Sequence, residues 1–453
     1  MAIQRYSQPR FNPYGDDAPI DEHGPWSAPF HPDAITATLS LPGSKSLTNR
    51  ELVLSALADG PSLIRDPMHA RDSALMIEAL RNLGVEIQQV PGDSPFGDNL
   101  RVTPPTELLG STSIDCGLAG NVMRFTPLLA ALALGPTTFD GDEYARKRPM
   151  GGTIAALRAL GVDVAADSPD SLPFTVHGTG RVQGGEITID ASSSSQFVSG
   201  VLMAAPRFEQ GVSLRHSGER LPSLPHIEMT IAALAARGVT VETPEPGHWV
   251  VAPQAIAARE VRIEPDLSNA GPFLAAAVAT GGSVTIRNWP EHTTQVGNDL
   301  LDYLPLFGAT VTRSGADVTV AAGERIRGVQ LDLHTGGELA PPLVALAALA
   351  DEPSSFTGIG HIRHHETDRL AALVNEINAL GGNARELEDG IAIEPASLHG
   401  GLWHAYADHR MATAGALIGL RVEGVAVDEI GATSKTLPEF TELWSGMLGA
   451  TSV

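Results

Sequence analysis

The sequence contains very little cysteine and no long apolar run. Its 453 residues include one cysteine, Cys116, which excludes a disulfide framework and a zinc site built from cysteines. No apolar stretch reaches the roughly 20 residues that a membrane-spanning helix needs. Residues 1–22 also lack the apolar core of a signal peptide. These absences predict a soluble, cytoplasmic protein.

Basic residues are scarce as well, and lysine is the scarcest of them. The chain has 30 Lys and Arg against 53 Asp and Glu, and its formal net charge of -23 disfavours binding to nucleic acid. Only Lys45, Lys147 and Lys435 are lysines. Because lysine is a compact cation that can lose its proton, whereas arginine stays charged, a lysine kept in so arginine-rich a chain is a candidate for a chemical role. Alternatively, the three lysines have no special role and remain in the sequence by chance.

An internal repeat organises most of the chain. Six glycines, each closing a helical pattern that is mostly followed by a strand, recur about 70 residues apart: Gly84, Gly161, Gly238, Gly308, Gly381 and Gly449. A second series of Ala-rich helices begins near Leu52, Phe125, Phe197, Pro272, Pro341 and Met411. Six units of this kind predict two domains of three units each. The segment before them, rich in Pro, Gly and Asp, is expected to be a mobile tail.

Short polar segments precede the Ala-rich helices. They are 43–50, 118–124, 192–196, 266–271, 335–340 and 406–410. Helix N-termini favour anions, because their first N–H groups lack partners and the helix dipole is positive there. Simple N-capping would explain Ser194 or Ser268. It does not explain Lys45, Arg124 or Arg410, because a cation in a first turn opposes the dipole. The pattern therefore predicts a shared cleft for a ligand with several negative charges.

The motifs LPGSKSLTNR, AGNVMRF, YARKRPMGG, SSSSQF, HHETDRL, YADHRMA and ATSKTLPE resemble, in order and spacing, those of the EPSP synthase (3-phosphoshikimate 1-carboxyvinyltransferase) family of enolpyruvyl transferases. The likeness runs from about Ile35 to Gly449. It implies an α/β fold of two domains, each of three βαβαββ repeats, known as an inside-out α/β barrel. It places residues 34–43 with 267–449 in one domain and 44–266 in the other, with the active site in the cleft between them and residues 1–33 as the tail.

The same resemblance implies a shikimate-pathway transferase. Members transfer the enolpyruvyl group of phosphoenolpyruvate to the 5-hydroxyl of shikimate 3-phosphate and release phosphate. The residues carried over to shikimate 3-phosphate are Lys45, Ser46, Arg50, Ser194, Ser195, Gln196, Ser223, Glu338, His361 and His365. Those carried over to phosphoenolpyruvate are Lys45, Gly120, Arg148, Gln196, Arg369, Arg410 and Lys435. Arg124 lies in a matching motif, but a buried structural role explains it as well.

Addition followed by elimination needs a base for the attacking hydroxyl and an acid for C3 of phosphoenolpyruvate. Glu338 is the candidate base and Glu366 the candidate acid, and Lys45 is the cation expected to touch both substrates. Glu338 could instead cap a helix, and Glu366 could instead form an ion pair with Arg369.

No cofactor, metal or macromolecular partner is expected, and the chain is expected to be a monomer. The alternative of a metal held by His361, His364, His365 and Glu366 lacks a known spacing, and Cys116 is interpreted as a small buried residue. Two alternative functions are a UDP-N-acetylglucosamine enolpyruvyl transferase and a non-catalytic protein that binds phosphorylated metabolites. The sequence departs from the family pattern at Leu118, Asn121 and His226.

Overall fold

The structure is a computed structural model that describes residues 24–218, 221 and 223–449. By their contacts these residues divide into two compact units. Unit 1 comprises residues 43–263, and unit 2 comprises residues 24–42 with 264–449. The described chain passes from one unit to the other after Pro42 and after Ile263. The family resemblance predicts these two passages after residues 43 and 266.

Unit 1 contains three four-stranded sheets with one shared topology. In each sheet the first strand runs parallel to the second, which pairs with the last strand of an antiparallel hairpin. In spatial order the sheets are β14 (Glu260–Arg262), β3 (Ser62–Arg65), β5 (Asn99–Thr103) and β4 (Glu86–Val90); β6 (Thr112–Asp115), β7 (Leu134–Asp140), β9 (Phe174–Thr179) and β8 (Asp163–Ala166); and β10 (Gly185–Ile189), β11 (Val212–His216), β13 (His248–Val251) and β12 (Glu242–Glu245).

Unit 2 repeats this topology in two sheets and varies it in the third. The regular sheets are β2 (Thr36–Leu39), β15 (Ser283–Ile286), β17 (Asp317–Ala321) and β16 (Thr310–Ser314); and β18 (Gln330–Asp332), β19 (Ser354–Thr357), β21 (Gly390–Glu394) and β20 (Asn383–Leu387). The third sheet has three strands, β22 (Gly401–Trp403), β23 (Val425–Val427) and β1 (Trp26–Ser27). Here β1 pairs antiparallel with β23, in the place that a hairpin strand takes in the other sheets.

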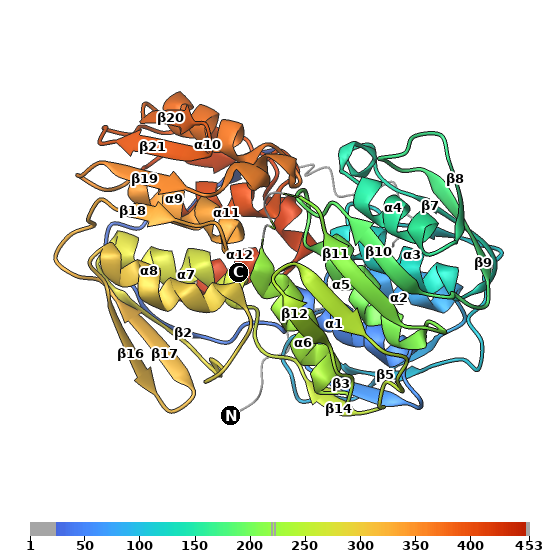
Figure 1. Ribbon diagram of the computed structural model, residues 1–453. Helices are drawn as coiled ribbons and strands as arrows, with labels where there is room; N and C mark the ends of the chain where they lie inside the picture. The colour runs from blue at the N-terminus through green and yellow to red at the C-terminus, as the bar shows by residue number, and fades with distance from the viewer. Residues whose placement is uncertain (1–23, 219–220, 222, 450–453) are drawn as a thin grey trace. The chain divides into compact units, whose positions relative to one another are not determined.

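Each repeat also carries two helices, and the first helix of each repeat is the more deeply buried. These inner helices are α1 (Lys45–Ala56), α3 (Gly120–Ala131) and α5 (Gln196–Ala204) in unit 1, and α7 (Leu267–Thr280), α9 (Ala340–Ala347) and α11 (His409–Gly419) in unit 2. The inner helices of a unit contact one another, as Figure 1 shows for α7, α9 and α11. Except for α1, which buries several polar side chains, these helices are largely apolar on all sides, which is typical of a helix at the centre of a core.

The second helices are α2 (Arg71–Asn82), α4 (Gly151–Ala159) and α6 (Leu224–Ala235) in unit 1, and α8 (Leu300–Leu306), α10 (Arg369–Ala379) and α12 (Phe440–Met447) in unit 2. Short 3₁₀ helices connect the larger elements: η1 (Ala145–Lys147), η2 (Ala205–Arg207), η3 (Val296–Asp299), η4 (Gly337–Leu339), η5 (Gly360–His364) and η6 (Ile430–Lys435). Among the described residues no helix is long and apolar enough to span a membrane.

The six predicted repeats are confirmed, with one exchange of strands. Strand β2 precedes α1 in the chain but pairs with β15 of unit 2, whereas β14 precedes α7 but pairs with β3 of unit 1. Each of these strands, β2 and β14, is the last strand before the chain leaves a unit, and each completes a sheet of the unit that the chain leaves. All six repeat glycines adopt a left-handed backbone with φ between 74° and 98° at the end of a helix, as a C-cap requires.

Two local predictions need correction. The helix expected near Leu52 begins at Lys45, because the polar side chains of its early turns find partners; Glu51, for example, pairs with the buried Arg237 at 2.6 Å. Part of the expected tail is ordered: β1 pairs with β23, and Ala28 is buried and donates its N–H to the Val425 carbonyl. Residues 1–23 of that tail lie outside the described residues.

Candidate active site

The inner helices α1, α5 and α11 are buried along their length except near their first residues, where several of the predicted ligands lie. In α1 every residue from Thr48 onward is buried, whereas Lys45 and Ser46 are partly exposed. In α5 only Gln196 is partly exposed, and in α11 only Arg410. The solvent-accessible ends of these helices are thus polar or cationic.

Lys45 is the first residue of α1, directly after the N-cap Ser44. Its ammonium lies 3.4 Å from the Asp72 carboxylate, which belongs to the first turn of α2 and is 1% exposed. The Lys45 side chain itself is 19% exposed, so it can reach both the buried carboxylate and a ligand. Asp72 is not among the predicted site residues, although an acidic residue in a first helical turn is a usable signal.

Arg50 lies deeper in α1 and is 1% exposed. Its guanidinium donates to Thr230 Oγ1 at 2.8 Å and to the carbonyl oxygens of Ser46 and His226, each at 2.9 Å. It also lies 5.4 Å from the centre of the Phe125 ring. In this arrangement Arg50 ties the start of α1 to α6, and so fixes the backbone of Ser46, a predicted contact position.

Three side chains converge on Gly120, the first residue of α3. A Cβ atom at this position would lie 2.8 Å from Arg124 Nη1, 2.9 Å from Arg148 Nη2 and 3.2 Å from Gln196 Oε1. Arg148 donates to the Leu118 carbonyl at 2.8 Å, and Arg124 donates to the Pro149 carbonyl at 2.9 Å. Only glycine leaves room for this approach, so two guanidinium groups and an amide gather at the start of α3.

The predicted serines lie at the starts of α5 and α6. Ser195 is the buried N-cap residue of α5, and Ser194 Oγ accepts the Gln196 N–H at 3.3 Å. Ser223 is the N-cap residue of α6 and has a left-handed backbone with φ of 53°. Their position at helix starts combines hydroxyl groups with the N–H groups that favour a phosphate.

In unit 2, Glu338 lies in η4 beside Ser268 and Arg410. Its carboxylate accepts a hydrogen bond from Ser268 Oγ and lies 3.8 Å from Arg410 Nη2. Arg410 also donates to the Ser268 carbonyl at 3.3 Å. The N-cap residue of the following helix α9 is Leu339, so Glu338 does not cap it. The carboxylate is 19% exposed and can meet a ligand.

A second carboxylate, Glu366, lies between two cations. It accepts a hydrogen bond from the Lys435 ammonium and one from Arg369 Nη2 at 2.9 Å. The predicted ion pair with Arg369 is therefore present, together with the Lys435 contact that sequence spacing did not reveal. Lys435 and Arg369 are 3% and 2% exposed, so these charges are largely removed from water.

Asp408, the N-cap residue of α11, completes this network. Its two oxygens accept from Arg369 Nε at 2.7 Å and Nη2 at 3.0 Å, and Oδ1 also accepts the Arg410 N–H at 2.8 Å. Burial alone would lower the pKa of Arg369, but Asp408 and Glu366 outweigh it and raise that pKa above its ordinary value. Asp408 was not among the predicted site residues, although its place before a helix was a signal.

Two histidines border the same region. Arg369 Nη1 lies 3.1 Å from His365 Nδ1, and because a guanidinium only donates, Nδ1 is the acceptor and the ring proton is on Nε2. His361 lies with its ring centre 5.8 Å from that of His365. Burial lowers the pKa of His361, and its Nε2 atom is buried without a hydrogen-bond partner among the described residues.

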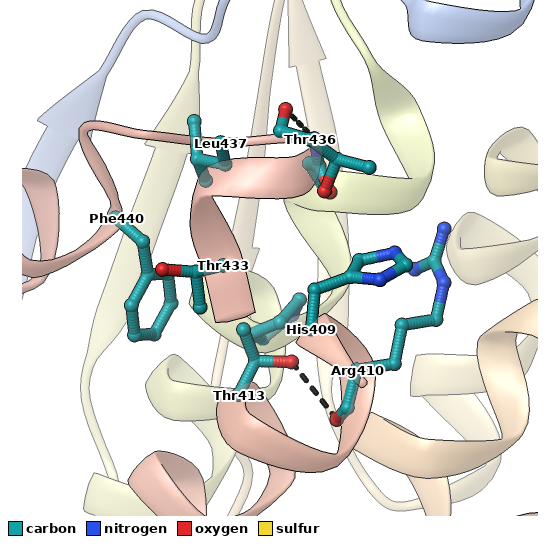
Figure 2. A pocket seen from close by; sticks show the side chains of 9 residues that line it. His409, Arg410, Thr413, Thr433, Thr436, Leu437 and Phe440 are labelled. Carbon is teal, nitrogen blue, oxygen red and sulfur yellow. Dashed lines mark hydrogen bonds between the residues drawn. The ribbon is translucent and has the colours of Figure 1, made fainter. Parts of the chain in front are cut away.

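A small pocket opens beside Arg410. It is lined by Asn269, Pro272, His409, Arg410, Thr413, Thr433, Thr436, Leu437 and Phe440, and its volume of about 10 Å³ is on the scale of a water molecule. Figure 2 shows the His409 ring and the Arg410 guanidinium extending to the same side, with Phe440 opposite. Thr413 Oγ1 donates to the Arg410 carbonyl at 3.1 Å and so fixes the start of α11.

The two units thus carry different chemistry. Unit 1 has Lys45 at the start of α1, Arg124 and Arg148 around Gly120 at the start of α3, and serine hydroxyls, a set suited to binding anions. Unit 2 pairs cations with two partly exposed carboxylates, Glu338 and Glu366, a set that can also move protons. Within the described residues no group of three or more His, Cys, Asp or Glu side chains could hold a metal ion.

Comparisons with known proteins identify the family. The family model of EPSP synthase (3-phosphoshikimate 1-carboxyvinyltransferase) matches residues 30–444. The chain belongs to the EPSP synthase family. It is 54% identical over 430 residues to the 3-phosphoshikimate 1-carboxyvinyltransferase of Kocuria rhizophila, covering 94% of this chain and 97% of that protein. It is 50% identical over 434 residues to that of Mycobacterium ulcerans, covering 94% and 99%.

Solved structures of EPSP synthase share the fold. The 2.37 Å structure from Acinetobacter baumannii matches with a TM-score of 0.76 and 22% identity, covering 93% of this chain and 98% of that one. A second structure from that organism matches with a TM-score of 0.74, 21% identity, and coverage of 92% and 97%. The predicted family and the predicted α/β fold of two three-repeat domains are confirmed. Cys116 is fully buried as predicted, and burial raises the pKa of its thiol.

Proposed function

We propose that this EPSP synthase family member transfers the enolpyruvyl group of phosphoenolpyruvate to the 5-hydroxyl of shikimate 3-phosphate. The observation that carries the proposal is the pair of carboxylates in unit 2, one in η4 and one in the bend between η5 and α10, each beside a cation. Glu338 lies 3.8 Å from Arg410, and Glu366 accepts hydrogen bonds from Lys435 and Arg369. Cations bind the anionic substrate, and carboxylates move the protons that addition and elimination require.

Shikimate 3-phosphate is bound mainly by helix-start residues. The proposed set is Lys45, Ser46, Arg50, Ser194, Ser195, Gln196, Ser223, Glu338, His361 and His365. The phosphate suits the hydroxyl and N–H groups at the start of α5, where Ser194 and Gln196 already form a turn. His365, whose Nε2 carries the ring proton, donates to an oxygen of this substrate. Arg50 acts chiefly by holding the Ser46 backbone.

Phosphoenolpyruvate is bound by Lys45, Gly120, Arg148, Gln196, Arg369, Arg410 and Lys435. The carboxylate and phosphate of this substrate need several donors, which the guanidinium groups supply in pairs. Lys45 is the cation shared by both substrates, because it is partly exposed yet held by the buried Asp72. The reaction requires residues of both units to act on one pair of substrates.

The proton transfers follow from the two carboxylates. Glu338 accepts the proton of the 5-hydroxyl as that oxygen bonds to C2 of phosphoenolpyruvate, with Arg410 3.8 Å from the carboxylate. Glu366 delivers a proton to C3, which becomes a methyl group in the tetrahedral adduct. Elimination then returns a C3 proton to the Glu366 carboxylate, breaks the C2–O bond to phosphate, which leaves, and forms the enol ether.

The test is a phosphate-release assay with both substrates and with each alone. We expect release only when both are present, and loss of nearly all turnover in Lys45→Met with shikimate 3-phosphate binding measured in parallel. Release with UDP-N-acetylglucosamine in place of shikimate 3-phosphate would favour the alternative transferase. Binding of both substrates without release would identify a non-catalytic binding protein.

We also propose that the protein is a cytoplasmic monomer without a cofactor. The proposed reaction needs no redox or group-carrying cofactor, because cations and carboxylates supply every step. Light scattering of the purified chain would show a mass near 47.4 kDa for a monomer. Full activity after dialysis against a chelator is expected.

A further inference from the structure

The segment that precedes α11 has a strained backbone. Tyr406 and Ala407 have φ of 56° and 54°, and they are the only consecutive non-glycine residues with positive φ in the described parts of the chain. Side chains with a Cβ rarely adopt this left-handed conformation, and it persists only where the surroundings enforce it. Something in unit 2 must therefore hold residues 404–407 in place.

Three acidic side chains hold this segment, one from α10 and two from the turn that follows β23. Glu376 of α10 accepts the Tyr406 hydroxyl at 2.5 Å and the His404 N–H at 2.8 Å. Asp428 accepts the Ala405 N–H, and Glu429 accepts the Ala407 N–H, each at 2.8 Å. Glu376 is only 3% exposed, so its charge is largely removed from water and depends on these donors.

The segment leads directly into the phosphoenolpyruvate residues. Asp408 follows it, caps α11 and binds Arg369, the first residue of α10. Glu376 lies seven residues after Arg369, which is two helical turns, so both face the same side of α10. Helix α10 thus holds the segment at two points, through Arg369 to Asp408 and through Glu376 to Tyr406.

We propose that the Tyr406–Glu376 hydrogen bond positions Asp408, and through it Arg369 and Arg410, for binding phosphoenolpyruvate. Tyr406 and Glu376 are positioning residues, because neither is among the proposed substrate contacts. The bond fixes the place of residues 404–407 along α10, and with it the orientation of Asp408 toward Arg369. This inference rests on the proposed function. It explains what holds Arg369 and Arg410 in the orientation that binds phosphoenolpyruvate.

The protonation state of Tyr406 supports this role. Burial, together with the hydrogen bond and the negative charge of Glu376, raises the pKa of Tyr406 to about 12. The hydroxyl therefore keeps its proton and donates to Glu376 throughout the neutral pH range.

The test is the Tyr406→Phe variant, with Tyr144→Phe as the matched control. The control removes an exposed hydroxyl in unit 1 and leaves the ring beside Lys147. Because a hydrogen bond to a charged group is commonly worth about a factor of ten, we expect KM for phosphoenolpyruvate to rise about tenfold. We expect kcat and the Kd for shikimate 3-phosphate to stay within about twofold of the wild type. Tyr144→Phe should change none of these values.

A rescue variant separates positioning from general stability. Glycine adopts positive φ without strain, so Ala407→Gly should favour the native backbone even without the Tyr406 bond. We expect Tyr406→Phe/Ala407→Gly to recover most of the KM loss, although it cannot restore the hydroxyl. Hydrogen exchange of residues 404–410, measured without substrate, should accelerate in Tyr406→Phe and slow again in the double variant.

Specific outcomes would overturn the proposal. An unchanged KM for phosphoenolpyruvate in Tyr406→Phe would do so, as would a double variant that shows no recovery. Equal losses in kcat, shikimate 3-phosphate affinity and thermal stability would show that the bond only stabilises unit 2. If the wild type fails to turn over both substrates, the proposed function fails. The hydrogen-exchange measurement then still decides whether the Tyr406–Glu376 bond stabilises the backbone of residues 408–410.

Discussion

Replacing Asp408 with asparagine should strongly destabilise unit 2, because it breaks a buried ion pair. Asp408 is fully buried and binds Arg369 through two hydrogen bonds of 2.7 and 3.0 Å, and Arg369 is itself 2% exposed. Asn keeps the size and the acceptor that caps α11. It removes the negative charge and leaves the buried guanidinium with Glu366 as its acidic partner.

The magnitude follows from the cost of a broken buried pair. Removing one partner of such a pair commonly costs about 3–5 kcal/mol, and the retained cap and the Glu366 contact place this variant near the lower value. In a domain of roughly 200 residues, 1 kcal/mol corresponds to about 2–4 °C in Tm. We therefore expect Asp408→Asn to lower the Tm of unit 2 by about 6–12 °C.

Differential scanning calorimetry measures this change, and Asp332→Asn is the matched control. Asp332 is exposed and accepts the His334 N–H, which asparagine can also do, so its replacement should cost less than about 0.5 kcal/mol. An Asp408→Asn variant within 1 kcal/mol of the wild type would refute the reasoning. It would mean that Arg369 does not need this carboxylate to remain buried.

Three further predictions concern single side chains. Gly120→Ala should raise KM for phosphoenolpyruvate more than it changes shikimate 3-phosphate affinity. The reason is that the new Cβ would lie 2.8 Å from Arg124 Nη1 and 2.9 Å from Arg148 Nη2. Steady-state kinetics measures the KM, and calorimetric titration measures the affinity. Glu338→Gln should lower kcat by about 10²–10⁴ with little loss of shikimate 3-phosphate affinity, because glutamine keeps the shape but cannot accept the proton; equal losses in both would contradict a role as base. Burial raises the pKa of Glu439 to about 7 from its ordinary 4.5, so the folded state holds this proton more tightly than the unfolded state. The contribution of Glu439 to the free energy of unfolding should therefore be fully present below about pH 4.5. It should fall by about 3 kcal/mol as the pH rises through 7. Urea unfolding of Glu439→Gln should lack that decline, and an identical pH profile in both proteins would count against the prediction.

Much of the fold could be predicted from local sequence patterns. The repeat glycines mark helix ends because a left-handed C-cap needs a residue without a side chain, and that demand is visible in sequence. The apolar inner helices are visible for a similar reason, since burial on all sides removes polar residues. The start of α1 was missed because its polar residues are satisfied by distant partners, such as Arg237 for Glu51.

The contacts of the candidate site were less predictable than its residues. Motif resemblance named Glu366 and Lys435, but their hydrogen bond joins positions 69 residues apart that no local pattern connects. The pairing of Arg369 with Asp408 spans 39 residues and depends on how α10 packs beside the start of α11. Strand β1 was missed for the same reason, because two residues form it only by pairing with β23.

The central claim is that the protein forms an enol ether through an adduct whose C3 is a methyl group. Proton NMR of the product made in D₂O tests it directly. Because C3 gains a solvent deuteron and elimination then removes one of three hydrogens, the account predicts an enol ether in which part of the vinyl hydrogen is replaced by deuterium. A product that retains all of its vinyl protons, or no product from the two substrates together, would contradict it.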